Sequence, residues 1–474
     1  MSKLSLVSTL MSITVATSAV AQTPVGPVRT AAVGEETQPF FDSLAALRPM
    51  PFEQMSLAPD TIGAVAWLDL LQDPVLVDLV REAVRSNRDM HLAQARIREF
   101  RAAVGVSKAD LYPQISANGT IGQSQVVFGS IGALGFETYR ATGDLTWELD
   151  FWGRIRSNAR GASLDLAAER EESRATILSL VSDVASAYLQ LRELDENLAI
   201  TERTLASRRE TLELARRRLA EGVISELDVL LFEAEVAAPA ARVAEFTRAI
   251  ARTEHQLSLL IGRVPGSIAR GRPLASVARA VVVPDEVSAD LIGRRPDVMG
   301  AAFDLDAAHA RTGAARKARL PTIFLNGQYG TQAENFSDMF KSNTEIFTAQ
   351  AGISIPLFTG GRLKNQQEVA AARAEQAEIR YERTVLTAMR EVSDAMIGVR
   401  TSRDQIAAQE TQTQALRRAF TLAERRYDAG IASYLEVLDA QRSLFNAELA
   451  LTSAEREYLV SAVTLYKALG GSWE

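Results

Sequence analysis

Two carboxylates in the last tenth of the chain are spaced so that they could act together. Glu436 and Asp439 lie three positions apart, so on a helix they would share one face, and Leu435 directly precedes them. Acids on a shared face attract cations if their environment leaves them unpaired. The simpler alternative is a solvated helix face, with Arg442 pairing with Asp439, and the residues alone leave both interpretations open.

No motif typical of an enzyme accompanies this acid pair. His91, His255 and His309 lack the spacing of metal ligands, cysteine is absent, and neither G-x-S-x-G nor a P-loop occurs. The glycines at 129–135 precede an expected strand rather than a helix, which makes a poor phosphate loop. We therefore expect a protein that is not an enzyme and binds no cofactor or metal, so any energy must come from a partner.

Composition and the N-terminal residues narrow the class of protein. The chain has 474 residues, 47% of them hydrophobic, and a net charge of -7 with no basic stripe, which argues against nucleic acid as a partner. Residues 1–21 combine Lys3, an apolar run and an Ala-Val-Ala end, which predicts a secretory signal. No later segment offers 18 consecutive apolar residues, so we expect no transmembrane helix.

Alternating side chains predict a β-hairpin that runs into a helix. Residues 138–151 are apolar or small at odd positions and mostly polar at even positions, so the strand has one apolar and one polar face. At Gly153 and Arg154 the spacing of apolar residues changes from every second residue to every three or four residues, which is the spacing of a helix. Heptad-spaced apolar residues then continue to about residue 220, a helix of roughly 100 Å at 1.5 Å per residue.

The same pattern recurs 208 residues later, where Gly361 and Arg362 stand at the positions of Gly153 and Arg154. The chain is therefore predicted to be a tandem duplication. The expected organisation is a signal at 1–21, a lead-in at 22–72, a first repeat at 73–262, a connector at 263–287, a second repeat at 288–470 and a tail at 471–474. The first repeat comprises a helix from about Asp73 to Lys108, strands at about 112–128 and 138–152, a long helix at 153–220 and a return helix at 225–262. The second comprises a helix, strands at about 321–333 and 345–358, a long helix at 361–428 and a return helix at 433–470.

Four strands with one apolar face cannot close a barrel, because about eight strands are the smallest working number. The strands also carry charges on their polar faces, including Arg140, Asp144 and Glu148. These features favour a membrane barrel with a watery lumen, closed by several copies of the chain. The alternative is a small sheet packed on a soluble core.

Several motifs together resemble one family. They are WELDFWGR at 147–154, IPLFTGGR at 355–362, GRRPDV at 293–298, DPVLVDLVREAVRSNRD at 73–89 and YKALGGSW at 466–473. They resemble the TolC-like outer membrane factor family, most closely its OprM/NodT branch, over roughly residues 67–473. This resemblance implies an α+β membrane protein in which three chains form a twelve-stranded outer-membrane β-barrel, four strands from each, continuous with a long periplasmic α-helical coiled-coil barrel.

The resemblance also implies a function. Members are passive exit ducts of tripartite efflux pumps in the Gram-negative outer membrane, and they work with a periplasmic adaptor protein and an inner-membrane pump, here expected to be of the RND type. Many members of this branch carry a lipidated cysteine, whereas this chain has no cysteine, so we expect the barrel to be its only attachment to outer-membrane lipid. Alternatives are the exit duct of a type I protein-secretion system and, in another class, a soluble periplasmic coiled-coil scaffold or adaptor.

The resemblance also implies roles for residues at the positions that match functional positions of the family. The two expected hairpin tips would meet the adaptor, although glycine turns with a serine cap need no function. The second repeat would line a periplasmic gate, where Glu436 is a longer carboxylate than the acid of the family. The tip residues are Gly222, Val223, Ser225, Gly430, Ile431 and Ser433, and the gate residues are Tyr427, Leu435, Glu436 and Asp439.

Overall fold

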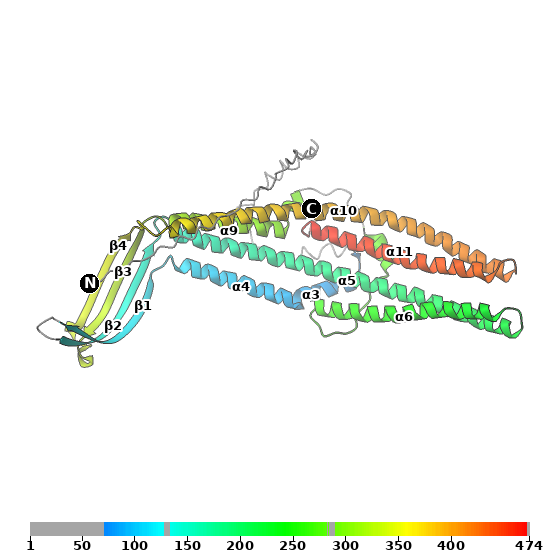
Figure 1. Ribbon diagram of the computed structural model, residues 1–474, viewed down its shortest axis with the longest axis horizontal. Coiled ribbons are helices and arrows are strands. Elements are labelled where there is room, and N and C mark those ends of the chain that lie inside the picture. The colour runs from blue at the N-terminus through cyan, green and yellow to red at the C-terminus, as the bar shows by residue number, and fades with distance from the viewer. Residues whose placement is uncertain (1–70, 128–132, 282, 284–289, 472–474) are drawn as a thin grey trace, which may run out of the picture. The chain divides into compact units, whose positions relative to one another are not determined.

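Long helices and one four-stranded sheet make up the structure (Figure 1). The computed structural model describes residues 71–127, 133–281, 283 and 290–471. The described residues all belong to one packed unit, residues 49–474. The predicted signal, most of the lead-in and most of the tail lie outside the described residues.

The first half of the chain contains two helices, a hairpin and a long helix pair. Hairpin strands β1 and β2 lead into α5, which has 67 residues, and α6 returns along it. The small helix α7 follows in the connector, and α8 then begins the second repeat. The bounds are α3 Pro74–Ser86, α4 Arg88–Ala109, β1 Gln114–Val127, β2 Ala133–Leu149, α5 Arg154–Ala220, α6 Glu226–Leu260, α7 Leu274–Ala280 and α8 Asp290–Gly293.

The second half has the same order of elements. Its long helix α10 also has 67 residues, and its return helix α11 has 35 residues, as does α6. Two short 3-10 helices, η4 and η5, lie between its strands. The bounds are α9 Pro296–Lys317, β3 Thr322–Ala333, η4 Phe336–Asp338, η5 Ser342–Thr344, β4 Glu345–Ser354, α10 Arg362–Asp428 and α11 Tyr434–Ala468.

The four strands form one antiparallel sheet in the order β1-β2-β3-β4. Asp144 lies opposite Ser116 on one side and Gln328 on the other, so even-numbered residues of three strands share a face. On that face Asn118 donates to Asp144 at 2.6 Å, Gln328 also donates to Asp144, and Arg140 donates to Gln328. The predicted polar face is therefore a connected hydrogen-bond network across β1, β2 and β3.

The opposite face of the sheet is apolar and, in the part of the chain that the structure describes, largely uncovered. Ile121 and Phe347 are each 76% exposed, and Ile353 is 66% exposed. In register, Tyr329 lies opposite Phe347, and Ile323 lies opposite Ile353. An apolar face of this size is costly to leave open to water, and none of the described residues outside the sheet covers most of it.

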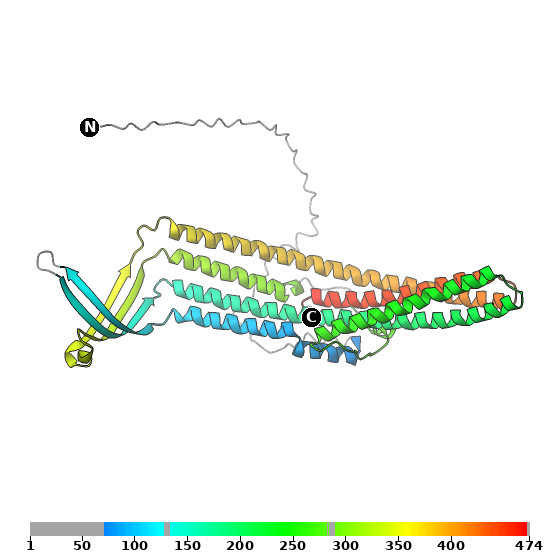
Figure 2. The same cartoon turned by 60° about the horizontal axis from the view of Figure 1, so that its bottom comes forward.

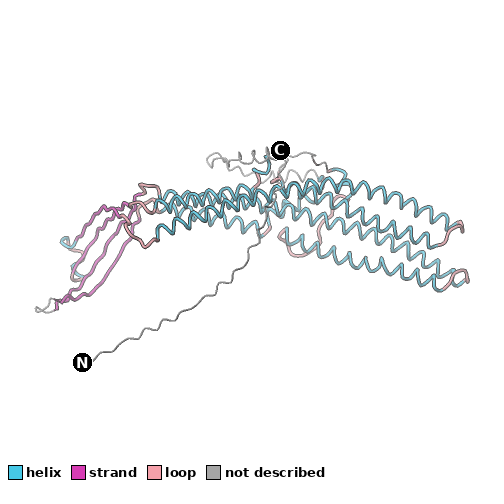
Figure 3. Tube along the Cα trace, turned by 45° about the horizontal axis from the view of Figure 1, so that its top comes forward, coloured by secondary structure: helices cyan, strands magenta, loops and turns pink. Residues whose placement is uncertain are grey.

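Near the sheet, α4, α5, α9 and α10 lie side by side in that order, with neighbours in contact (Figure 2). Further along, α5 pairs with α6 and α10 pairs with α11, and Figure 3 shows the strands at one end of these long helices and the hairpin turns at the other. Within the described part of the chain, none of the helices combines the length and apolar character needed to cross a membrane.

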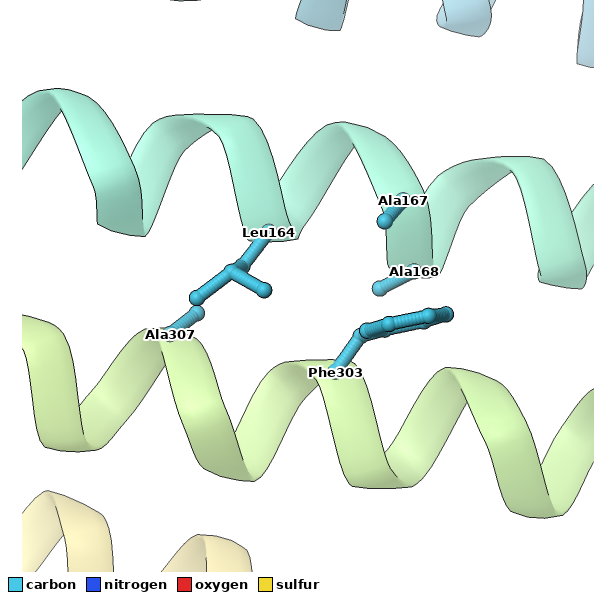
Figure 4. Packing of buried hydrophobic residues seen from close by; sticks show 5 residues of the cluster. All are labelled: Leu164, Ala167, Ala168, Phe303 and Ala307. Carbon is cyan, nitrogen blue, oxygen red and sulfur yellow. The ribbon is translucent and has the colours of Figure 1, made fainter. Parts of the chain in front are cut away.

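Small side chains allow α5 and α9 to pack closely (Figure 4). Leu164, Ala167 and Ala168 of α5 meet Phe303 and Ala307 of α9, and all five side chains are buried. Burial of a Phe or Leu side chain stabilises a fold by about 1.5–3 kcal/mol. Alanine on the facing surface provides the space for the Phe303 ring, so this contact joins the two repeats of the chain.

The structure corrects several predicted boundaries. The prediction of one helix from Asp73 to Lys108 is wrong, because the chain breaks at Asn87, whose side chain caps α4 through the amide of Asp89 at 2.7 Å. The same side chain donates to the carbonyl of Leu260 at 2.9 Å. The predicted connector contains the helix α7. The second repeat begins with two helices rather than one, because α8 ends at Gly293 and α9 begins at Pro296. The second and fourth strands end at Leu149 and Ser354 rather than at about 152 and 358.

An acidic cap fixes the start of the first repeat. Asp73 accepts hydrogen bonds from the amides of Val75 and Arg272 and from the hydroxyl of Tyr188, which is buried on α5. A Cβ on Gly271 would lie 2.0 Å from Asp73 Oδ1, so only glycine fits at that position. This contact holds the connector against α3 and α5, which the sequence did not reveal.

A buried acid lies where α11 meets neighbouring helices. Glu455 is 5% exposed, and burial together with the charge of Glu196 on α5 raises its pKa to about 7, with Glu410 of α10 acting in the same direction and Arg279 of α7 opposing. Ionised Glu455 is therefore unfavourable in the folded protein.

We expect Glu455→Gln to stabilise the protein at pH 8 and to have little effect at pH 4. The folded-state pKa lies above the ordinary value of 4.5, so the native protein holds a proton that the unfolded chain has lost, and stability falls as pH rises from about 4.5 to 7. At pH 8 the variant should regain roughly 3 kcal/mol in the free energy of unfolding. Thermal unfolding followed by circular dichroism at both pH values measures it, with Glu457→Gln, an exposed neighbour, as control; equal shifts at both pH values would contradict the assignment.

Candidate functional site

The two hairpin tips are tight turns with the same backbone geometry. Gly222 and Gly430 have φ of +73° and +72°, the left-handed region in which residues with a side chain are strained. After each glycine the next amide bonds back to the helix, from Val223 to Arg218 and from Ile431 to Arg426, both at 2.9 Å. A Cβ on either glycine would meet nothing within 4 Å, so the tips are open to their surroundings.

The helices that leave the two tips are capped differently. Ser225 and Asp228 form a capping box, in which Asp228 accepts from the Ser225 hydroxyl at 2.7 Å and amide at 2.9 Å. These hydrogen bonds hold the pKa of Asp228 below its ordinary value. Ser433 makes no capping bond through its side chain, and Glu436, at the position that matches Asp228, lies 3.7 Å from Arg426 instead. The second tip therefore has fewer local restraints than the first.

Tyr427 links the two hairpins near their tips. Arg218 of α5 donates to the Tyr427 hydroxyl, and its guanidinium lies 5.2 Å from the centre of the Tyr427 ring. The Tyr427 ring packs edge-on against Tyr434 at 5.4 Å, and Tyr434 packs on Phe232 of α6 at 4.2 Å. Burial raises the pKa of Tyr434 to about 12. Arg218, Phe232 and Tyr434 were not predicted, because no sequence pattern shows which side chains of the two repeats face each other.

The other predicted gate residues lie at the start of α11. Leu435, Glu436 and Asp439 are all exposed. Arg442 lies 3.8 Å from Glu235 of α6, and this pair replaces the Arg442–Asp439 pair of the simpler interpretation. Tyr427 and Leu435 line the same cavity, whereas Glu436 and Asp439 lie outside it.

Polar contacts continue the link between the hairpins away from the tips. The buried Arg208 of α5 pairs with Glu235 of α6 at 2.7 Å, so Glu235 lies between Arg208 and Arg442 of the second repeat. Gln441 of α11 donates to Ser207 at 3.2 Å. Separation of the hairpins would therefore break the Gln441–Ser207 hydrogen bond and the Arg442–Glu235 ion pair in addition to the Arg218–Tyr427 contact.

The first strand-to-helix junction is held by acids. Gly153 has φ +75°, and Arg154 makes a two-point contact with Glu148 at 2.8 and 3.2 Å. Asp150 accepts from the amides of Ile155 and Arg156, both at 2.9 Å, and so caps the start of α5. This junction fixes the direction in which the helix leaves the strand.

The second junction lacks these acids. Gly361 has φ +83° and Arg362 begins α10, as predicted, but Pro356 and Phe358 occupy the positions of Glu148 and Asp150. Phe358 is almost fully exposed. The predicted equivalence of Arg154 and Arg362 therefore holds for the backbone, while the carboxylate partner is present only in the first repeat.

Comparison with known proteins places this geometry in a family. The family model described as outer membrane efflux protein matches residues 79–263 and 287–471, one match for each half of the chain. The toluene efflux pump outer membrane protein TtgC of Pseudomonas putida is 34% identical over 412 residues, covering 86% of this chain and 85% of its own. The cation efflux system protein CusC of Escherichia coli O157:H7 is 29% identical, covering 88% and 90%.

Solved structures agree with the sequence comparison. The outer membrane protein VceC of Vibrio cholerae superposes with a TM-score of 0.79 at 27% identity, covering 87% of this chain and 99% of that one. The relatives therefore span the helices and the sheet together rather than a single part. With two family matches that together cover more than half of its length, the chain is a member of the outer membrane efflux protein family.

Proposed function

We propose that the protein is the passive exit duct of a tripartite efflux pump, with three copies enclosing one channel across the outer membrane and into the periplasm. The observation that carries this proposal is the sheet, which is open at β1 and β4, polar and hydrogen-bonded on one face, and exposed and apolar on the other. Three copies supply twelve strands, which close the edges, turn the apolar face to lipid and enclose the polar face.

The helices support the same arrangement. In the layer of α4, α5, α9 and α10, the outer helices α4 and α10 each lack a neighbour on one side among the described residues. Ile379 and Leu386 of α10 are 57% and 59% exposed, and Val106 of α4 is also exposed. Contact between α10 of one copy and α4 of the next would bury these side chains and continue the barrel into a helical wall.

The partners and the cargo follow from this architecture. We infer that a periplasmic adaptor docks on the tips, at Gly222, Val223 and Ser225 and at Gly430, Ile431 and Ser433, and couples the duct to an inner-membrane pump of the RND type. The relatives carry names as different as toluene efflux and cation efflux. Because ducts of one architecture carry both kinds of name, we infer that the duct does not select the exported compound and that the inner-membrane pump selects it.

Purification tests the core of the proposal. Full-length protein extracted in detergent should be a trimer that shifts in electrophoretic mobility on heating, and reconstitution into a planar bilayer should produce conductance. Four strands cannot close alone, so a monodisperse monomer soluble in plain buffer would contradict both the barrel and the duct.

We expect Gly430→Val to abolish coupling to the adaptor while the trimer and barrel stay intact. A β-branched residue at φ +72° is strained by about 1–2 kcal/mol and displaces Ile431 and Ser433, whereas the strands lie roughly 100 Å away along α10. Site-specific crosslinking to the adaptor measures the loss. Gly430→Asn is the control, because asparagine tolerates this conformation; undiminished crosslinking and normal export by the valine variant would exclude the docking role.

A further inference from the structure

The loop between β3 and β4, residues 334–344, exposes two aromatic side chains at the end of the strands that lies away from the helices (Figure 2). Phe336 is 62% exposed and Phe340 is 85% exposed. Contacts within the loop fix its shape, because the amide of Lys341 donates to the carbonyl of Asp338 at 3.0 Å and their side chains form an ion pair at 2.6 Å. None of the described residues covers the Phe340 ring, although a phenylalanine ring held in water is costly.

One aromatic contact shows on which side of the sheet this loop lies. The ring of Phe336 packs edge-on against the ring of Tyr139, with 5.8 Å between their centres. Tyr139 is an odd-numbered residue of β2, and the odd-numbered residues form the apolar face of the sheet. Its partner in register is Ala333, the last residue of β3. The loop therefore turns towards the apolar face and away from the polar face.

The apolar face ends at the level of this loop. The next odd-numbered residue of β2 is Glu137, whose carboxylate accepts from the Tyr139 hydroxyl at 3.4 Å. Strands β3 and β4 have 12 and 10 residues, close to the roughly 9–11 residues with which a tilted strand crosses a bilayer. The loop therefore lies at the rim where the apolar face gives way to polar residues.

The composition of the loop suits the boundary between lipid headgroups and acyl chains. Aromatic side chains gather at this boundary in membrane barrels, and segments that lie in it carry apolar residues on one side and polar residues on the other. The apolar residues of the loop are Phe336, Met339 and Phe340, and the others are Glu334, Asn335, Ser337, Asp338, Lys341, Ser342, Asn343 and Thr344.

We propose that this loop is an interfacial anchor, which lies on the outer leaflet of the outer membrane with Phe336 and Phe340 inserted among the acyl chains just below the headgroups. The proposal rests on the outer-membrane barrel proposed above and goes beyond it, because it assigns the loop to lipid rather than to the pore. Three copies of the loop then lie around the exit of the duct and leave that exit open.

Spin labels test the anchor directly, because the chain has no cysteine and a single introduced cysteine is labelled at one position. In full-length protein reconstituted into phosphatidylcholine vesicles, a nitroxide on Phe340→Cys should collide with oxygen, which concentrates in the bilayer, and should lose most collisions with a water-soluble nickel chelate. Phe347→Cys on the apolar face and Thr348→Cys on the polar face provide the lipid and water references from adjacent residues of β4.

The outcomes separate the anchor from the barrel. Nickel access at position 340 equal to that at position 348 would place the loop in water, and a label shielded from both reagents would place it against another copy of the chain. Either result, with position 347 in lipid, would overturn the anchor alone. Nickel access at position 347 equal to that at position 348 would overturn the barrel and the anchor with it.

A second variant tests the contact that holds the loop on the apolar face. Phe336→Ser in the labelled Phe340→Cys protein should raise nickel access at position 340 towards the value at position 348, whereas Ser337→Ala, which removes no ring, should not. Phe336→Ser together with Phe340→Ser should leave the single-channel conductance in a planar bilayer unchanged. A larger conductance would place the rings over the exit, and unchanged nickel access in the Phe336→Ser variant would contradict the role of the Tyr139 contact.

Discussion

Replacement of Ile379 and Leu386 together by aspartate is expected to abolish trimer assembly. The two side chains are 57% and 59% exposed in one chain and seven residues apart, so they share one face of α10. The opposite side of α10 is buried through alanines such as Ala374, Ala377 and Ala388. In the proposed assembly that exposed face contacts α4 of the next copy.

The expected effect on assembly is large for two reasons. Because each side chain is already partly buried in one chain, loss of the two apolar contacts removes about 2–4 kcal/mol from each interface, and the new carboxylates would be buried without partners. In one chain the same positions face water, so the helix itself should stay folded. Analytical ultracentrifugation in detergent measures the oligomer, and circular dichroism checks the helical content.

A matched pair of variants separates charge from packing. Ile379→Met and Leu386→Met together retain apolar volume, so this variant should still assemble. A trimer formed by the double aspartate variant would contradict the proposed contact between α10 and α4, whereas an unfolded protein would be recognised by its lost helical signal and distinguished from a folded monomer.

The second large effect concerns the acids at the second tip. Replacement of Glu436 and Asp439 by alanine is expected to weaken block by multivalent cations applied from the periplasmic side at least about tenfold and to reduce cation preference. In a trimer these residues supply three copies each around one axis. Like charges so arranged repel one another and attract cations, and Leu435 together with the hairpin contacts must hold the aperture against that repulsion.

The structure ranks the two acids. Glu436 lies 3.7 Å from Arg426, whereas Arg442 pairs with Glu235 rather than with Asp439. An exposed pair such as Glu436–Arg426 is weak but still offsets part of the charge. We therefore expect Asp439→Ala alone to reduce block more than Glu436→Ala alone.

Planar-bilayer recordings of single channels measure both predictions. Asp228→Ala is the control in the first repeat, because the Asp228 carboxylate already accepts a hydrogen bond from Ser225. The first repeat also has no second acid, since Leu231 occupies the position that matches Asp439. If the double variant kept native block and ion selectivity, the acids would be no more than a solvated helix face.

Local features of the fold were predictable because neighbouring residues determine them. The alternation at 138–151 specified which side chains share a face, and the network of Asn118, Asp144 and Gln328 lies on the predicted polar face. The long helices were expected at 153–220 and 361–428 and are found at Arg154–Ala220 and Arg362–Asp428, because glycine in the left-handed region begins and ends each of them.

The candidate site was predictable only in part. Gly222 and Gly430 could be predicted as turn residues, since a turn of this kind needs glycine. No sequence pattern indicated that Arg218, Phe232 and Tyr434 belong to the site. Arg218 and Tyr427 lie 209 residues apart, and their contact depends on how two hairpins pack on each other. Periodicity assigns a residue to a face of its own helix and contains no information about the partner of that face.

The repeat, the lengths of the long helices, the faces of the strands and, through the motifs, the family could therefore all be predicted from the order of residues. Other features become visible only in the folded chain: the break at Asn87, the hydrogen bond from Tyr188 to Asp73 beside Gly271, the raised pKa of Glu455, and the cavity between the hairpins. The physical reason is the range of the interactions. Helix and strand periods arise from backbone geometry over a few residues, whereas caps, buried charges and cavities arise where segments distant in sequence exclude water together.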